Sequence, residues 1–197
     1  MKLNFNEIIP KFDSILSRGL CSGLGDKNGQ MCIEAAICAS LNLPHGDQPP
    51  CVTPAIIRYK ITLNDAKWSS PVSRAKNLRA LGIAQIGSLG IVNGQDFVNK
   101  LQHKTISILI PDLFDTLYPN KFTELVNECR STGDKLACRK LAAAATDVAA
   151  AAAATYATVA TYAAAADVDK SDKYLIMSAN LALEVLKELK SPGCDWI

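Results

Sequence analysis

The feature that most constrains this chain is a stretch of 58 residues, Asp134–Ser191, that contains neither glycine nor proline. It also holds most of the alanine, because 16 of the 27 alanines in the chain lie between Leu141 and Ala166. Alanine has the highest helix propensity, and glycine and proline are the residues that usually end helices. The stretch therefore predicts one long helix over Asp134–Val168 and a last helix over Ser171–Leu189.

Alanine side chains are small, so each buries little apolar area but lets neighbouring helix axes approach closely. We therefore expect the alanine-rich helix to lie at the centre of a helical bundle. The alternative is that this helix forms a seam between copies of the chain in a homo-oligomer, such as a dimer.

The rest of the chain also favours helices, because its apolar residues recur at helical spacing. Thr53-Pro54, Ser70-Pro71 and Asn93 are typical of helix starts. The β-branched run Thr105–Ile110 also suits a strand, but its helical flanks favour a helix that Pro111 would end or kink.

No hairpin or strand–helix–strand pattern appears, so the predicted fold class is all-α, a helical bundle. Residues 1–110 would form an N-terminal helical domain with a glycine-rich loop. Residues 111–197 would form a C-terminal helical hairpin or bundle, and the two groups could also pack as a single domain.

Composition excludes several classes of protein. The 197 residues are 49% hydrophobic and 20% charged, which is typical of a globular protein and excludes a disordered chain. The net charge of +2 argues against a long nucleic acid as partner. No secretory signal opens the chain and no apolar run could span a membrane, so we expect a cytoplasmic protein with no membrane partner.

Seven cysteines occur without a Cys-x-x-Cys pair, so we expect reduced, mostly buried thiols rather than a disulfide framework. Cys32, Cys38, His45 and Cys51 are at least six residues apart, so none forms the close pair that structural zinc prefers. The sequence therefore predicts no metal site and no cofactor.

A glycine-rich segment, Gly19–Gln30, precedes a predicted helix over Met31–Leu41. Glycines let backbone N–H groups approach an anion, and the first turn of a helix adds unpaired donors. Within and beside this segment, the candidate ligand-binding residues are Arg18, Gly23, Gly25 and Lys27. The alternative is a tight turn between helices, because neither a P-loop nor a dinucleotide-binding motif is present.

Two further segments complete the candidate site. The proline-rich loop after residue 43 offers His45 and Asp47, and the segment 58–79 has six basic residues and one acidic residue. Trp68 in that segment could stack on a base while arginines hold phosphate. The ligand-binding candidates here are His45, Asp47, Arg58, Asn64, Trp68 and Arg74. The alternatives are a core tryptophan and a solvated basic face.

Cys32 lies near the start of the predicted helix, where a thiol can become a nucleophile. A cysteine-dependent hydrolase using Cys32 and His45 is therefore an alternative hypothesis. The two residues are much closer in sequence than the cysteine and histidine of papain-like enzymes.

The segments Gly29-Gln30-Met31-Cys32-Ile33-Glu34-Ala35-Ala36, Leu43-Pro44-His45-Gly46-Asp47, Leu63-Asn64-Asp65 and Trp68-Ser69-Ser70 resemble a set of bacterial and phage proteins without an assigned activity. Those proteins also carry an alanine-rich segment and a closing Ser-Pro-Gly. The resemblance implies a phage or mobile-element accessory protein, and it transfers no site residue.

The leading hypothesis is a non-enzymatic, all-α binding protein for a small anionic ligand such as a nucleotide. One example is a phage accessory protein that sequesters a nucleotide immune signal. The second hypothesis is a protein-interaction module, an inhibitor or immunity-type protein that binds a host protein. The hydrolase is the third.

Overall fold

The chain is all-α in the computed structural model, which describes residues 3–145 and 168–197, and this confirms the predicted fold class. The described helices are α1 (Phe5–Leu16), α2 (Ile33–Ser40), α3 (Pro54–Asp65), α4 (Pro71–Ala84), α5 (Gly94–Lys104), the π-helix η1 (Thr105–Leu109), α6 (Ile110–Leu117), α7 (Thr123–Thr132), α8 (Lys135–Ala144), α11 (Val168–Glu188) and the 3₁₀-helix η2 (Pro192–Trp196). No strand occurs in the described residues, and no described helix has both the length and the apolar character needed to cross a membrane.

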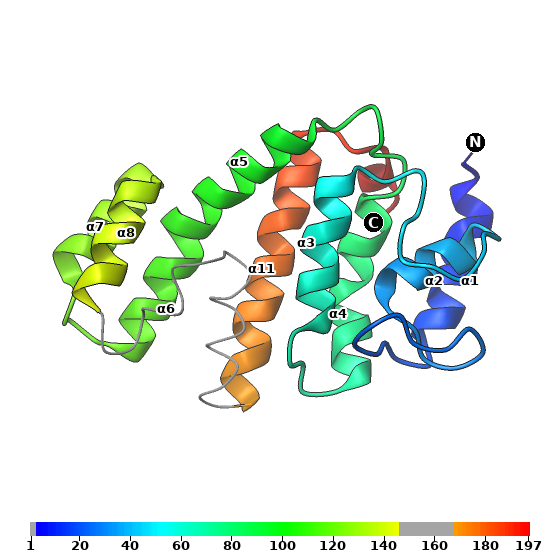
Figure 1. The fold of residues 1–197 in the computed structure, drawn as a ribbon, viewed down its shortest axis with the longest axis horizontal. Helices are drawn as coiled ribbons and strands as arrows, with labels where there is room; N and C mark the ends of the chain where they lie inside the picture. Colours follow the sequence, from blue (N-terminus) through cyan, green and yellow to red (C-terminus); the bar gives the residue numbers. More distant parts are fainter. Residues whose placement is uncertain (1–2, 146–167) are drawn as a thin grey trace.

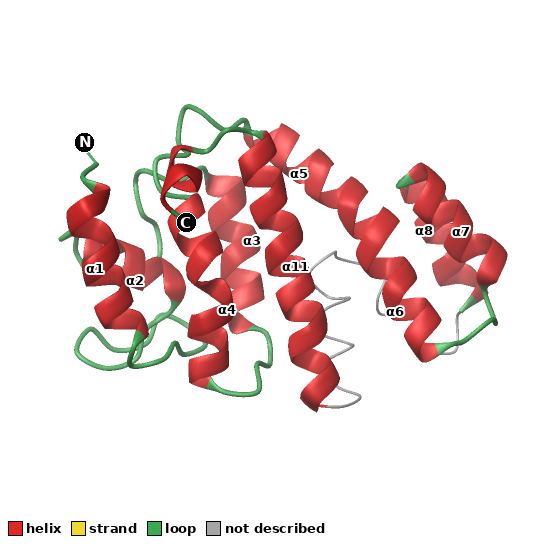
Figure 2. Cartoon of the chain, turned by 180° about the vertical axis from the view of Figure 1, so that it is seen from behind, coloured by secondary structure: helices red, strands yellow, loops and turns green. Residues whose placement is uncertain are grey.

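The helix α11 packs on both α3 and α4, with α1 and α2 on one side of this group and α5 on the other (Figure 1). Helix α7 packs on α6, and α8 packs on α7, at the far end of the molecule, as the view from behind also shows (Figure 2). Because α11 packs on α4 and α3, the last helix of the chain lies against the N-terminal half. One continuous hydrophobic core includes side chains from both halves.

The helix starts follow the predicted signals. The Ser70 hydroxyl accepts the N–H of Ser73 at 3.0 Å, and the Asn93 side chain accepts the N–H of Gln95 at 2.8 Å. Thr53 does precede α3, but its hydroxyl donates to the backbone oxygens of Ser88 and Val92 instead of capping the helix. The start of α3 is thereby tied to the loop that follows α4.

Pro111 does not end the helix in which it lies. The backbone stays helical from Gly94 to Leu117, and the five residues before α6 form a π-helix. Proline lacks an N–H and its ring crowds the preceding turn. The wider π turn accommodates this disruption, so α6 continues the helix of α5.

The prediction of one unbroken helix from Asp134 is wrong, because α8 ends at Ala144 and the backbone angles of Ala145 (φ −103°, ψ 29°) are not helical. Asp134 caps α8 by accepting the N–H of Ala137 at 2.9 Å, as expected for a helix that begins there. The prediction for residues 146–167 lies outside the described residues. The last helix, α11, spans Val168–Glu188. It begins three residues before the predicted Ser171 and includes Val168, the predicted end of the preceding helix.

Asp172 attaches α11 to the connection between α3 and α4. Its carboxylate accepts the N–H of Ser69 at 2.9 Å and the hydroxyls of Ser69 and Ser73. Partial burial raises the pKa of Asp172, but these hydrogen bonds and the nearby charge of Arg74 outweigh it and hold the pKa below its ordinary value. The carboxylate is thus favoured in its charged form.

Helices α1 and α4 cross where α4 has a glycine. A Cβ atom at Gly82 would lie 2.7 Å from the ring of Phe12 and 3.1 Å from the side chain of Ile33. The absence of a side chain is therefore what lets the fully buried Phe12 fit against α4.

We expect Gly82→Ala to destabilise the protein. Overpacking costs about 1–3 kcal/mol, and this exceeds the gain of about 1 kcal/mol from the higher helix propensity of alanine. Chemical denaturation measures the change. Combining the substitution with Phe12→Leu makes room for the new methyl group, so the double variant should lose less stability than the sum of the two single variants. If the losses in free energy of unfolding of the two single variants simply add in the double variant, Gly82 and Phe12 are not in close contact.

We expect Asp172→Asn to lower the stability of the folded protein by an amount that depends on pH. The native pKa of Asp172 is depressed, so its contribution is fully present above the ordinary pKa of about 3.8. It is lost as the pH falls through the lower native pKa. Thermal denaturation should show a lower midpoint for the variant at neutral pH and a smaller difference in acid. A difference that stays constant over this range would show that the hydrogen bonds do not depend on the carboxylate charge.

Candidate functional site

The glycine-rich segment forms a closed loop. Within it the N–H of Asp26 donates to the oxygen of Gln30, and the N–H of Cys21 donates to the oxygen of Met31. The N–H of Gly23 donates to the carboxylate of Asp65 on α3 at 2.8 Å. These donors are used by protein acceptors, so the loop resembles the tight interhelical turn more than an open anion cradle.

Gly25 explains why this loop can close. Its φ is +74°, in the left-handed region that favours glycine. A Cβ atom there would collide with the sulfur of Cys21 and the backbone oxygen of Gln30. The glycine predicted as an anion contact therefore permits close packing within the loop.

The N-terminus of α2 is capped by the protein itself. The sulfur of Cys32 accepts the N–H of Ala35 at 3.4 Å, and the side chain of Asn64 accepts the N–H of Ile33 at 3.3 Å. Asn64 also donates to the backbone oxygen of Cys21. One side chain of α3 thus joins the start of α2 to the glycine-rich loop.

A small pocket of about 30 Å³ lies at this junction. It is formed by three segments that are distant in sequence: the glycine-rich loop with the start of α2, the loop around Asp47, and the end of α3. Its lining residues are Gly23, Leu24, Cys32, Ile33, Glu34, Asp47, Ile61, Asn64 and Asp65. Three of these are acidic, and the described lining contains no basic residue.

The structure brings together part of the predicted site. Gly23, Asp47 and Asn64 line the pocket. Gly25 and His45 do not line it but contact each other, because the Nε2 atom of His45 lies 3.3 Å from the backbone oxygen of Gly25. The other ring nitrogen of His45 is buried without a hydrogen-bond partner in the described part of the chain.

The predicted basic and aromatic residues have other positions. Arg18 donates to the backbone oxygen of Asn28, and Lys27 and Arg58 are exposed. Trp68 is buried and donates to the backbone oxygen of Leu63.

Arg74 is also buried, and it donates to the backbone oxygens of Leu20 and Ala66. Trp68 therefore lies where the alternative of a core tryptophan places it. Arg74 is buried rather than part of a solvated basic face, and it holds the connections around α3 and α4.

Sequence reasoning missed a buried polar cluster beside the pocket. Glu34 on α2, Lys60 on α3 and Gln85 at the end of α4 are all fully buried. Lys60 Nζ lies 3.3 Å from Glu34 Oε1, and Gln85 Nε2 donates to both carboxylate oxygens of Glu34, at 3.2 and 2.9 Å. The available signal was that Glu34 is the single charged residue in the otherwise apolar helix α2.

Burial dominates the electrostatics of the cluster. It raises the pKa of Glu34 and lowers the pKa of Lys60, while the attraction between the two groups acts in the opposite direction on each. Each ion would be costly alone, so removal of one partner leaves an uncompensated buried charge.

The geometry does not favour Cys32 as a nucleophile. Its side chain is 4% exposed, and burial raises the pKa of its thiol despite the N–H groups of the helix start. The neighbouring charges of Glu34 and Asp47 raise it further. The reactive thiolate is therefore disfavoured at neutral pH.

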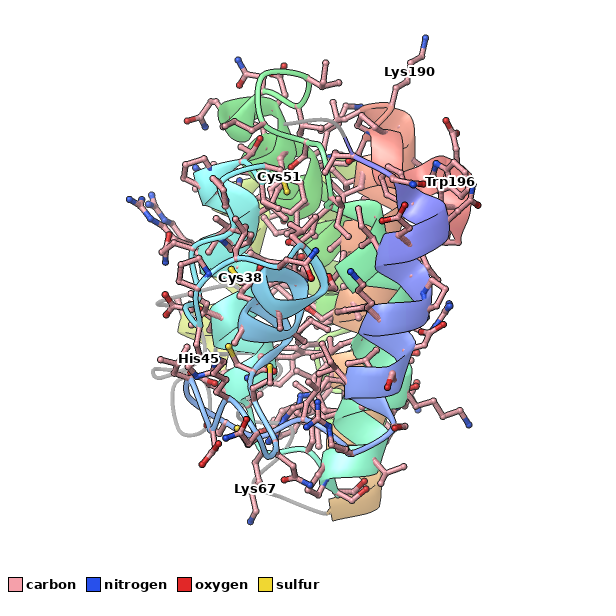
Figure 3. The ribbon with its side chains drawn as sticks, turned by 90° about the vertical axis from the view of Figure 1, so that its right-hand side faces the viewer. Cys38, His45, Cys51, Lys67, Lys190 and Trp196 are labelled. Atoms are coloured by element: carbon pink, nitrogen blue, oxygen red, sulfur yellow. The ribbon has the colours of Figure 1, made fainter. Side chains whose placement is uncertain are left out.

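No group of three or more metal-ligating side chains comes together among the residues that the structure describes. Figure 3 shows Cys38, His45 and Cys51 at separate places along one side of the molecule rather than around one point. Cys38 is further disfavoured as a ligand because burial and nearby Glu34 raise the pKa of its thiol to about 11.

Comparison with known proteins gives no match: no family model, no curated protein and no solved structure is similar to this chain. The resemblance to bacterial and phage proteins therefore stays a prediction.

We expect Lys60→Met to destabilise the protein by about 3–5 kcal/mol, because Glu34 would stay buried without its partner. Adding Glu34→Gln should recover most of the loss, since the new amide is neutral and still accepts from Gln85. Urea denaturation measures both variants.

The matched control is Lys100→Met, which removes a lysine from an exposed ion pair with Glu188. Lys100→Met should lower the free energy of unfolding by less than about 1 kcal/mol. An equal cost for the two lysine variants would contradict the importance of the buried pair.

Iodoacetamide should leave Cys32 unmodified in the native protein at neutral pH and modify it after denaturation. Peptide mass spectrometry gives the extent of labelling at each cysteine. Rapid native labelling of Cys32 would instead support the hydrolase hypothesis.

Proposed function

We propose that the protein is a non-enzymatic binding protein that holds a polar group of a small ligand in the pocket between Gly23, Asp47 and Asn64. The observation that carries the proposal is the buried Glu34–Lys60 pair beside that pocket. Buried ionisable groups with perturbed pKa values, next to a cavity with convergent polar side chains, are typical of functional sites.

The size of the pocket limits what can enter it. A cavity needs about 10–15 Å³ to hold one water, so 30 Å³ admits about two waters or one ammonium-sized group. Pockets for whole drug-sized ligands have about 300–1,000 Å³. We infer that a head group enters the pocket while the rest of the ligand lies on the two exposed loops beside it.

The lining favours a group that donates hydrogen bonds. The described side chains at its polar edge, Asp47 and Asp65, are carboxylates and accept hydrogen bonds. Both lie beside the N-terminus of α2, where negative charge interacts favourably with the helix dipole. A primary ammonium therefore suits the pocket better than the phosphate of the nucleotide hypothesis, whose arginine Arg74 is used within the core.

A panel of small ions tests the proposal by thermal denaturation at matched ionic strength. Methylammonium and longer primary amines should raise the midpoint, and tetramethylammonium should not, because it is larger and has no N–H donor. At one hundred times its dissociation constant, a ligand stabilises by about 2.7 kcal/mol. The same measurement with a set of nucleotides forms the second arm of the experiment and tests the anionic-ligand hypothesis.

Asp47→Asn should reduce the effect of the primary amines, whereas the control Asp96→Asn, an exposed substitution on α5, should not. Stabilisation by nucleotides alone would favour the anionic-ligand hypothesis over ours. If neither arm shifts the midpoint, the binding function is wrong.

A further inference from the structure

The lining of the pocket is apolar as well as acidic. Leu24, Ile33 and Ile61 contribute aliphatic side chains to it. Leu24 belongs to the glycine-rich loop and is 41% exposed, so its side chain borders both the pocket and the solvent. Ile61 is partly buried on α3, one helical turn before Asp65, so these two side chains lie on the same face of that helix. A group that enters the pocket therefore meets carboxylates and hydrocarbon within the same small space.

The loop holds Leu24 in place from both sides. The N–H of the preceding Gly23 donates to the carboxylate of Asp65 at 2.8 Å. The oxygen of the following Gly25 lies 3.3 Å from Nε2 of His45. Single exposed leucines are common on protein surfaces, but the backbone of this one is already ordered beside a pocket. Leu24 therefore offers apolar area that a ligand can cover at a lower entropic cost than on a mobile loop.

Charge limits what the carbon next to the bound ammonium can carry. Glu34, Asp47 and Asp65 line the pocket, and the described lining contains no basic residue. A free amino acid has a carboxylate on the carbon next to its ammonium, so its binding would bring like charges together, which is costly. An aliphatic carbon at the same position has no such cost and can bury apolar area on Leu24.

We infer that the ligand is an aliphatic primary amine without a neighbouring carboxylate, whose ammonium enters the pocket while its hydrocarbon part covers Leu24. The inference rests on the proposed function, because it takes the ammonium site as given and adds the chemical class of the rest of the ligand. Leu24 is then a specificity-determining residue, which distinguishes amines by their carbon chains and leaves the binding of the ammonium itself to the carboxylates.

Isobutylamine and valine form a matched pair, because valine is isobutylamine with a carboxylate added beside the ammonium. Thermal denaturation over a concentration series, at matched ionic strength, gives an apparent dissociation constant for each, with methylammonium as the reference. Full burial of a methylene increases affinity about fourfold, so three additional carbons that each gain half of that free energy on Leu24 give about an eightfold increase. We expect this gain for isobutylammonium over methylammonium, and no saturable shift for valine.

Leu24→Ser should remove the difference between isobutylammonium and methylammonium and leave the binding of methylammonium unchanged. The matched control is Leu89→Ser, which replaces an exposed leucine in the loop after α4. Leu89 does not line the pocket, so this variant should keep the preference for isobutylammonium.

Three results would overturn the inference while the ammonium site remains. They are equal binding of the two amines to the native protein, a preference that is unchanged in Leu24→Ser or lost equally in Leu89→Ser, and saturable binding of valine. If neither amine shifts the midpoint of the native protein, the proposed function itself fails, which is a distinguishable result.

Discussion

Burial of a carboxylate and an ammonium costs several kcal/mol for each ion, and this protein buries both where three helices meet. Glu34 comes from α2, Lys60 from α3, and Gln85 from the end of α4, so neither ion can be satisfied unless all three helices are in place. Helices in apolar contact can shift along each other at little cost, because hydrophobic burial is not directional. The ion pair and hydrogen bonds of this cluster form in only one relative position of the three helices. The position of α2, and of every group at its N-terminus, depends on that arrangement.

The candidate site follows from the same packing. Once α2 lies against α3, Asn64 reaches both the first turn of α2 and the oxygen of Cys21, and the glycine-rich loop closes beside them. The acceptors Asp47 and Asp65 then lie at the edge of a small pocket whose deeper lining includes Glu34. A polar pocket against a costly buried pair is the basis of our proposal that a small donor group binds there. The raised pKa of the Cys32 thiol opposes covalent chemistry at this cysteine.

The sequence predicted the fold better than the site. Local signals such as Ser70-Pro71 and Asn93 predicted helix starts because capping depends on residues only two or three positions away. The pairing of Glu34 with Lys60 joins residues on two helices, and no local pattern reports it. Trp68 and Arg74 were predicted as ligand contacts because tryptophan can stack on a base and arginine can bind phosphate. Their hydrogen-bond partners are backbone oxygens, which the sequence alone does not identify.

Hydrogen exchange of Lys60→Met against the native protein tests the central claim, that the buried pair fixes α2 and the pocket. We expect protection to fall mainly in α2, in the part of α3 that faces it and in the glycine-rich loop, while α7 keeps its native protection relative to global unfolding. A uniform loss over all helices, or no loss in α2, would contradict the claim.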